Sequence, residues 1–259
     1  MMSRLSIITA VGLAGASLFA QGPGRHMGAG PMGPGDFALV RAEFGVSNKV
    51  VQGSPYSAQA TTQFTQSLAN GDHIQRTSTG TIARDSQGRT RTERSFGAIG
   101  ALSAGRGAGQ TVMIFDPVAS KSIVLEPQSK TARSTTIPAA RAANSTSTRT
   151  PRILASAKTE DLGTQVMQGV NVQGKRVTRA IPAGQEGNEK EIDIVTETWF
   201  SADLQAVVMS KTSDPRYGES VYQLSAIIRA EPDPALFTVP SDYTVKEGRP
   251  MHQRPAAAQ

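Results

Sequence analysis

The residue types that could carry chemistry are few and widely spaced in this chain of 259 residues. It contains three histidines, His26, His73 and His252, and no cysteine. We expect these histidines in a linker, at a hairpin edge and in a tail, where they cannot assemble a Ser-His-Asp triad or a histidine-rich metal site. The missing thiols exclude disulfide frameworks, cysteine nucleophiles and zinc ribbons.

One series of carboxylates could serve a hydrolase or a calcium site. Glu191, Asp193 and Glu197 alternate along a predicted strand and therefore share a face with Val195 and Trp199. Same-face side chains on a straight strand are about 7 Å apart, whereas a calcium loop bends until its oxygens converge. We therefore predict a solvated face paired with basic neighbours, and an unrecognised hydrolase is only the third functional hypothesis.

Two further motifs have the composition of a binding site without its context. Residues 105–109 (GRGAG) resemble a phosphate loop, but they precede a predicted strand, whereas phosphate loops open a helix. His26 with Met27 and Met32 could hold a soft metal, but their spacing is irregular. We therefore predict no catalytic residue, no metal site and no cofactor.

The N-terminal segment indicates export. Met1 to Arg4 give a short cationic start, and residues 5–20 form a charge-free, mostly apolar run that ends in small residues. A bilayer span needs about 20 apolar residues, and this run is shorter. Residues 1–20 are therefore predicted to be a signal peptide, cleaved after Ala20 or, alternatively, after Ala16. The mature chain is expected to be periplasmic or secreted, with no transmembrane segment and no cysteine for a lipid anchor.

Composition then divides the rest of the chain. Nine of the fourteen residues 22–35 are glycine or proline, so residues 21–36 are predicted to be a flexible linker. We expect one curved antiparallel β domain over residues 37–246 and a disordered tail over residues 247–259.

Alternating side chains and turn residues predict the strands. A first meander is expected over residues 56–68, 73–84 and 89–96, with Asn70-Gly71 as a hairpin turn. A second follows over residues 111–115, 122–125 and 131–137. The first two of these strands are apolar on both faces, which predicts cover on both sides of the sheet. The C-terminal half is predicted to hold strands over residues 163–167, 170–180, 191–200, 205–212 and 219–229.

Helical signals are scarce. One segment within residues 151–158 could be helical, and one turn is expected at residues 233–237. In that turn Asp233 can act as the cap, and Leu236 and Phe237 can press against the end of the sheet. We therefore predict a mainly β fold, a single strongly curved antiparallel sheet or half-barrel of about eleven strands with few short helices.

Four segments resemble known proteins. Residues 231–243 (EPDPALFTVPSDY) and residues 198–205 (TWFSADLQ) are similar to the close and to one hairpin of the lipoprotein-carrier superfamily, which includes LolA, LolB and RseB. Residues 181–184 (IPAG) and 214–219 (DPRYGE) resemble a family of uncharacterised secreted bacterial proteins more closely. The resemblance implies a half-barrel whose concave face holds acyl chains under a helical lid.

Basic residues outnumber acidic ones by 27 to 21, and their excess is uneven. Residues 127–159 contain six lysines and arginines and no acid. Such density favours an anionic lipid surface or an acidic partner in the envelope, while export argues against nucleic acid. The alternative is a mobile loop kept soluble by charge. The candidate anionic-partner patch comprises Arg76, Arg89, Arg91, Lys130, Arg133, Arg141, Arg149 and Arg152.

The leading functional hypothesis is a non-catalytic, secreted or periplasmic protein that shelters a hydrophobic lipid or acyl ligand on a concave sheet. The alternative is an RseB-like interaction or sensor module that binds a protein or an anionic partner through its basic loops. The candidate ligand-lining residues are Met113, Phe115, Val124, Trp199 and Met209.

Overall fold

The computed structural model describes residues 50–95, 110–137 and 157–248, all within one structural unit spanning residues 33–259. Strands account for 64% of the described residues, and none of these residues lies in an α-helix. The described part of the chain is therefore mainly β, as predicted.

The first half of the described chain forms two meanders close to the predicted ones. Asn70 shapes the first turn, since its Oδ1 accepts a hydrogen bond from the Asp72 amide at 3.1 Å and Gly71 has a φ of 88°. The left-handed backbone there favours glycine. The six strands are β1 Tyr56–Ser67, β2 His73–Arg84, β3 Thr90–Ser95, β4 Gln110–Asp116, β5 Lys121–Glu126 and β6 Thr131–Thr136.

The second half has longer strands and one strand that the sequence did not predict. Residues 157 and 158 belong to a strand, which corrects part of the predicted helix at 151–158; its other residues lie outside the described part of the chain. The unpredicted strand is β12, the twelfth where about eleven were expected. The elements are β7 Ala157–Met167, β8 Val170–Ile181, β9 Ile192–Ser201, β10 Ala206–Asp214, β11 Gly218–Ile228, the 3-10 turn η3 Pro234–Phe237 and β12 Thr244–Glu247.

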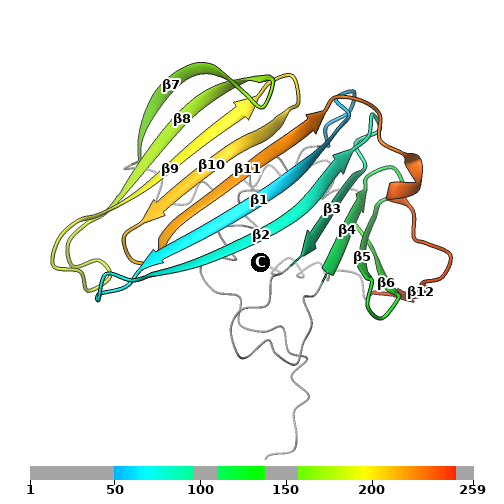
Figure 1. Ribbon diagram of the computed structural model, residues 1–259, viewed down its shortest axis with the longest axis horizontal. Coiled ribbons are helices and arrows are strands. Elements are labelled where there is room, and N and C mark those ends of the chain that lie inside the picture. Colours follow the sequence, from blue (N-terminus) through cyan, green and yellow to red (C-terminus); the bar gives the residue numbers. More distant parts are fainter. Residues whose placement is uncertain (1–49, 96–109, 138–156, 249–259) are drawn as a thin grey trace, which may run out of the picture. The chain divides into compact units, whose positions relative to one another are not determined.

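All twelve strands belong to one sheet. Their order is β12-β6-β5-β4-β3-β2-β1-β11-β10-β9-β8-β7, and the sheet is not closed, as a half-barrel requires. Only β12 and β6 pair in parallel. Figure 1 shows β1 beside β11, the pair that joins the two halves of the chain.

The pairing register defines two faces, because residues that face each other across strands point to the same side. We call one side the tyrosine face and the other the glutamine face. The tyrosine face carries Tyr56, Ala58, Ala60 and Thr62 of β1 with Tyr222 and Leu224 of β11. The glutamine face carries Gln59, Thr61 and Gln63 of β1 with Gln223 and Ser225 of β11.

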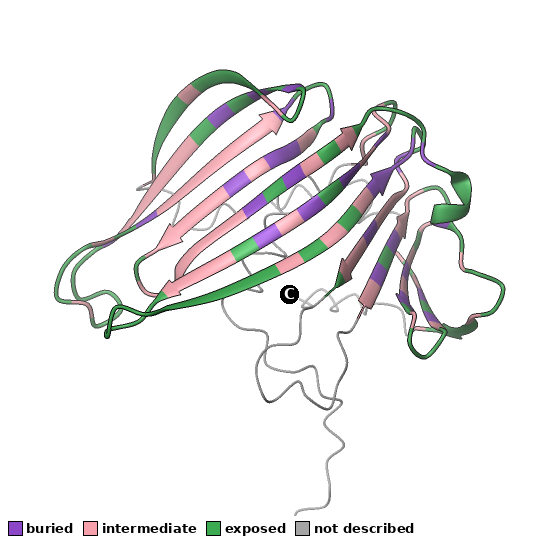
Figure 2. Cartoon of the chain, viewed as in Figure 1, coloured by how far each residue is buried: buried purple, intermediate pink, exposed green. Residues whose placement is uncertain are grey.

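The buried side changes along the sheet. In its centre the tyrosine face is buried, with Leu224 at 0% exposure, while Gln59 and Gln63 are exposed. Across β4 to β6 the glutamine face is buried instead, and Phe237 of η3 packs on it together with Val239. The buried residues of this second cluster are Ala83, Val112, Ile114, Ile123, Leu125, Ala132 and Phe237. Figure 2 shows buried positions along the central strands and mostly exposed ones along the edge strand β7.

The 3-10 turn forms where it was predicted. Asp233 caps it by accepting a hydrogen bond from the Ala235 amide at 2.9 Å, and Pro234 occupies the start. Phe237 is 3% exposed, but Leu236 is 37% exposed, so the prediction that both press against the sheet is wrong for Leu236.

Arg84, at the end of β2, joins two loops to the sheet. Its guanidinium donates to the Ser54 carbonyl at 2.9 and 3.1 Å, and also to the carbonyls of Leu204 and Gln205. It stacks on the Tyr56 ring at 4.8 Å from the centroid, and burial lowers its pKa. A buried cation is tolerated here because carbonyl oxygens and an aromatic face replace water.

In the described part of the chain, no helix has the length and apolar character needed to cross a membrane.

Candidate functional site

Three of the five predicted ligand-lining residues lie together on the tyrosine face. Met113 of β4 faces Val124 of β5, and Phe115 follows Met113 on the same side. Met113 also faces Thr92, which faces Ile82, which in turn faces Ala58. The pairing therefore places these three residues on the same side as Tyr56 and Tyr222.

The other two lie on the opposite side of the sheet. Trp199 of β9 faces Met209 of β10, Met209 faces Gln223, and Gln223 faces Thr61. Trp199 also lies flat on Gly174 of β8. The five candidates thus form two groups on the two faces and do not line one common surface.

The apolar residues on the two faces of β4 and β5 have different surroundings. Ile114 and Leu125 on the glutamine face are each 1% exposed, beneath the segment that contains η3. On the tyrosine face, Val124 is half-buried and Met113 is 37% exposed. The predicted cover on both sides is therefore incomplete at Met113, where the sheet presents an apolar side chain to solvent.

Toward the sheet centre the tyrosine face carries small side chains between two tyrosines. Ala58, Ala60 and Thr62 are all buried, and Tyr56 and Tyr222 are 3% and 4% exposed. Burial raises the pKa of both tyrosines, so their hydroxyl groups stay neutral. On β1 this face carries no charge between the tyrosines, and across β2 and β3 toward Met113 it also carries Arg94, which faces Gly80, the partner of Ala60.

The described members of the predicted basic patch do not share one surface. Arg89 pairs with buried Asp85 and stacks on Phe237 at 5.0 Å, and Arg91 donates to the Leu236 carbonyl at 3.2 Å. Lys130 pairs with Asp242 at 2.9 Å, which raises the pKa of Lys130.

The remaining basic candidates fall into two groups. Arg76 of β2 and Arg133 of β6 are exposed on the tyrosine face, where they face Phe64 and Val124 respectively. Arg141, Arg149 and Arg152 lie outside the described residues.

The carboxylates proposed for hydrolysis do not form a catalytic pair. Glu191 and Asp193 are exposed, and Glu197 pairs with Arg176 of β8 at 2.7 Å, the basic neighbour that was predicted. No group of three or more His, Asp or Glu side chains that could hold a metal occurs among the described residues. His26, His252 and residues 105–109 lie outside them.

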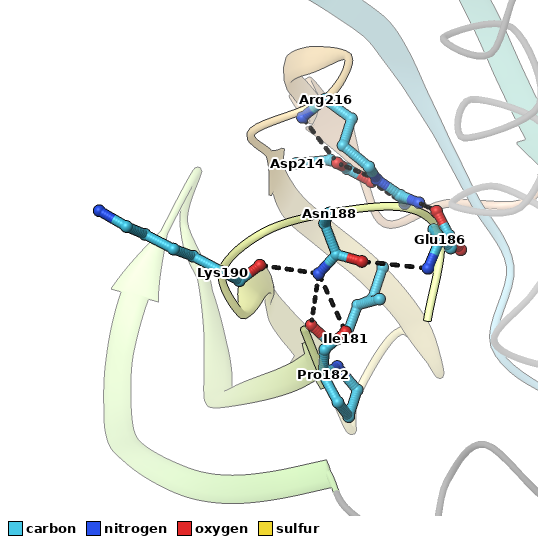
Figure 3. A network of polar contacts seen from close by, with 7 residues as sticks. All are labelled: Ile181, Pro182, Glu186, Asn188, Lys190, Asp214 and Arg216. Atoms are coloured by element: carbon cyan, nitrogen blue, oxygen red, sulfur yellow. Dashed lines mark hydrogen bonds and ion pairs between the residues drawn. The ribbon is translucent and has the colours of Figure 1, made fainter. Parts of the chain in front are cut away.

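A polar network joins the two motifs quoted for their resemblance to secreted proteins (Figure 3). Arg216 donates to both carboxylate oxygens of Asp214, at 2.9 and 2.7 Å, and also contacts Glu186 of the β8–β9 loop. Asn188 shapes that loop by donating to the carbonyls of Ile181, Pro182 and Lys190. Burial raises the pKa of Asp214, but its bonds to Arg216 outweigh burial and lower it.

The sequence alone predicted no role for Arg216, Glu186 or Asn188. The sequence signal for this network was the polar turn Asp214-Pro215-Arg216, but the partner of that turn, Glu186, comes from another loop. A hollow of about 430 Å³ lies beside it, with exposed His73 and Tyr217 in its lining. The charges of Asp214 and Arg216 neutralise each other, and the network holds the loops together.

The described strands form one open, mostly antiparallel sheet, and comparison with solved structures finds chains of similar fold. Similar solved structures include a chain of the MucA/MucB complex of Pseudomonas aeruginosa (11% identity, 85% of this chain and 67% of that chain, TM-score 0.43). They also include lipoprotein LppX of Mycobacterium tuberculosis (12%, 75% and 96%, TM-score 0.34) and a LolA superfamily protein of Nitrosomonas europaea (9%, 75% and 95%, TM-score 0.27).

These likenesses concern the fold alone. The chain spans 62% of MucB as solved by itself. No family model matches the sequence, and no curated protein matches it.

Proposed function

We propose that the protein is a non-catalytic binding protein that shelters a hydrophobic acyl ligand against its tyrosine face. The ligand packs on Met113, Phe115 and Val124 of β4 and β5. The observation that carries this proposal is the exposed Met113 on the tyrosine face, on a strand whose other face is almost completely buried.

The physical argument is that apolar surface of β4 and β5 remains in contact with water. Across β4 and β5 the glutamine face already packs under Phe237, so Met113 and Val124 gain nothing from that core. An acyl chain laid over them gains about 25 cal/mol for each Å² of apolar surface removed from water. Methionine suits this role because its flexible, polarisable side chain adapts to ligands of different shape.

The state of the described carboxylates supports a non-catalytic role. Glu197, Asp214 and Asp85 are each held by an arginine, and Glu191 and Asp193 are exposed without forming a pair. A general acid or base needs a poised group beside the reacting atoms. With the predicted signal peptide, the proposal places this binding in the periplasm or outside the cell.

A displacement assay with a fluorescent acyl probe tests the proposal. Replacing Met113 with Gln and Val124 with Thr keeps side-chain size but adds polar groups where the acyl chain would lie. We expect probe affinity to fall about tenfold, since about 1–2 kcal/mol of apolar contact is lost.

The matched control is Met209→Gln, which makes the same chemical change on the glutamine face. It should leave probe affinity unchanged. A native chain that binds no probe, or a control that loses as much affinity as the test variant, would contradict the proposal. Circular dichroism of each variant checks that the sheet is intact.

A further inference from the structure

Two cations continue the row that begins with Met113 and Val124. Arg133 of β6 faces Val124, and Lys246 of β12 faces Arg133. All four residues therefore lie on the tyrosine face, on four adjacent strands. Neighbouring strands are about 4.8 Å apart, so the row passes from apolar to cationic within about 14 Å.

Both cations are available to a ligand. Arg133 and Lys246 are exposed, and neither forms an ion pair or side-chain hydrogen bond within the described part of the chain. Lys130 nearby is different, because Asp242 holds it at 2.9 Å. Glu126 is the carboxylate on this face of β5, and it accepts a hydrogen bond from the Ser129 hydroxyl at 3.2 Å. One carboxylate against two cations leaves this end of the row positive.

We propose that the ligand of the tyrosine face is an anionic amphiphile. Its acyl chain lies on Met113, Phe115 and Val124, and its carboxylate or phosphate head group is bound by Arg133 and Lys246. This inference rests on the proposed function and specifies its ligand class. Arginine and lysine donate charge-assisted hydrogen bonds to such oxygens, and a fixed order of apolar and cationic residues orients the ligand along the row.

The test compares ligands that share one chain length and differ in head group. Dodecanoate, dodecyl phosphate and neutral dodecanol each displace the fluorescent acyl probe from the full chain. We expect both anions to displace it at lower concentration than dodecanol. The advantage should shrink as salt is added, because exposed charges are screened.

The double variant Arg133→Met with Lys246→Met keeps the aliphatic stems and removes the charges. We expect its affinity for the anions to fall about three- to tenfold, the effect of losing two exposed charge contacts. Its affinity for dodecanol should not change. The control is Arg76→Met, which removes one cation from the same face beside Phe64 of β1. That control should leave the preference for anions intact.

The outcomes separate the two proposals. If dodecanol binds as tightly as the anions, or the double variant keeps the anion preference, the head-group site is overturned while acyl binding stands. If no amphiphile displaces the probe, both proposals fail. If Arg133 and Lys246 are needed only for sedimentation with phosphatidylglycerol vesicles, the cations serve a membrane surface, and the single-ligand inference is overturned. A preference for one anion over the other identifies the head group as carboxylate or phosphate.

Discussion

Replacing Gly174 with alanine should disturb Trp199 in a predictable way. Gly174 lies on β8 directly opposite Trp199 of β9, and an added Cβ would meet three atoms of the indole ring at 2.5, 2.6 and 2.7 Å. The ring packs against the core cluster that contains Leu204, so it cannot yield inward without further strain. We expect Gly174→Ala to lower the free energy of unfolding by about 1–3 kcal/mol, the usual cost of overpacking.

Intrinsic fluorescence is a direct assay because Trp199 is the single tryptophan of the chain. In the folded variant the ring must tilt away from β8 toward solvent, so its emission should shift to longer wavelength. The urea midpoint, followed by the same signal, should fall in step with the lost stability.

Gly163 provides the matched control. It faces Gly174 from β7, and its φ of 77° makes alanine unfavourable there, but no atom lies within 4 Å of an added Cβ. Gly163→Ala should therefore cost about 1–2 kcal/mol through its backbone alone and leave the emission of the folded state unchanged. Native-like emission and stability in Gly174→Ala, or an equal emission shift in both variants, would refute the reasoning.

Three further predictions concern contacts that hold the sheet and its loops. Arg84→Met removes the donor to the carbonyls of Ser54, Gln205 and buried Leu204 and should cost about 2–4 kcal/mol in urea unfolding, and a loss below about 1 kcal/mol would contradict the proposed role of Arg84 in holding these loops. Phe237→Ala should cost about 3–5 kcal/mol by calorimetry, whereas Leu236→Ala beside it should cost about 1 kcal/mol or less because that side chain is 37% exposed. Equal losses would show that both side chains pack. The pKa of Asp214 lies below 3.8 in the folded protein, so its arginine contact stabilises the fold above that pH and is lost as the pH falls through the folded pKa. Asp214→Asn should make the acid-unfolding curve, measured by circular dichroism, shallower below about pH 4, and an identical curve would argue against this contact.

Local sequence patterns predicted most of the sheet. Alternation and turn residues placed β1 and β2 within one residue of their observed ends, because a half-buried strand and an Asn-Gly turn each have a strong local signal. β12 was missed because its four residues are too few to show a period. It forms by pairing with β6, more than a hundred residues earlier in the chain.

The candidate site could be predicted only in part. The apolar character of Met113, Val124 and Trp199 is visible in the sequence, but the face on which each lies depends on the register of every strand between them. A bulge between Val207 and Met209 shifts that register within the β9–β10 hairpin. One such shift moves side chains to the other face, and no local pattern announces it.

Loop contacts were beyond prediction for a related reason. Arg216 and Glu186 are 30 residues apart and meet only because β8 to β11 are neighbours in the sheet. Arg84 reaches carbonyls 30 and about 120 residues away in the chain. These contacts depend on the order of the strands in the sheet, so they could not be predicted before that order was known.

Crosslinking with a photoreactive fatty acid tests the central claim most directly. After irradiation and proteolysis, mass spectrometry locates the labelled peptide. Sheltering of an acyl chain on the tyrosine face predicts label on β4 and β5, residues 110–126, and loss of that label when excess dodecanoate is present. Label concentrated on β9 and β10 around Trp199 and Met209, or label that excess dodecanoate does not displace, would contradict it.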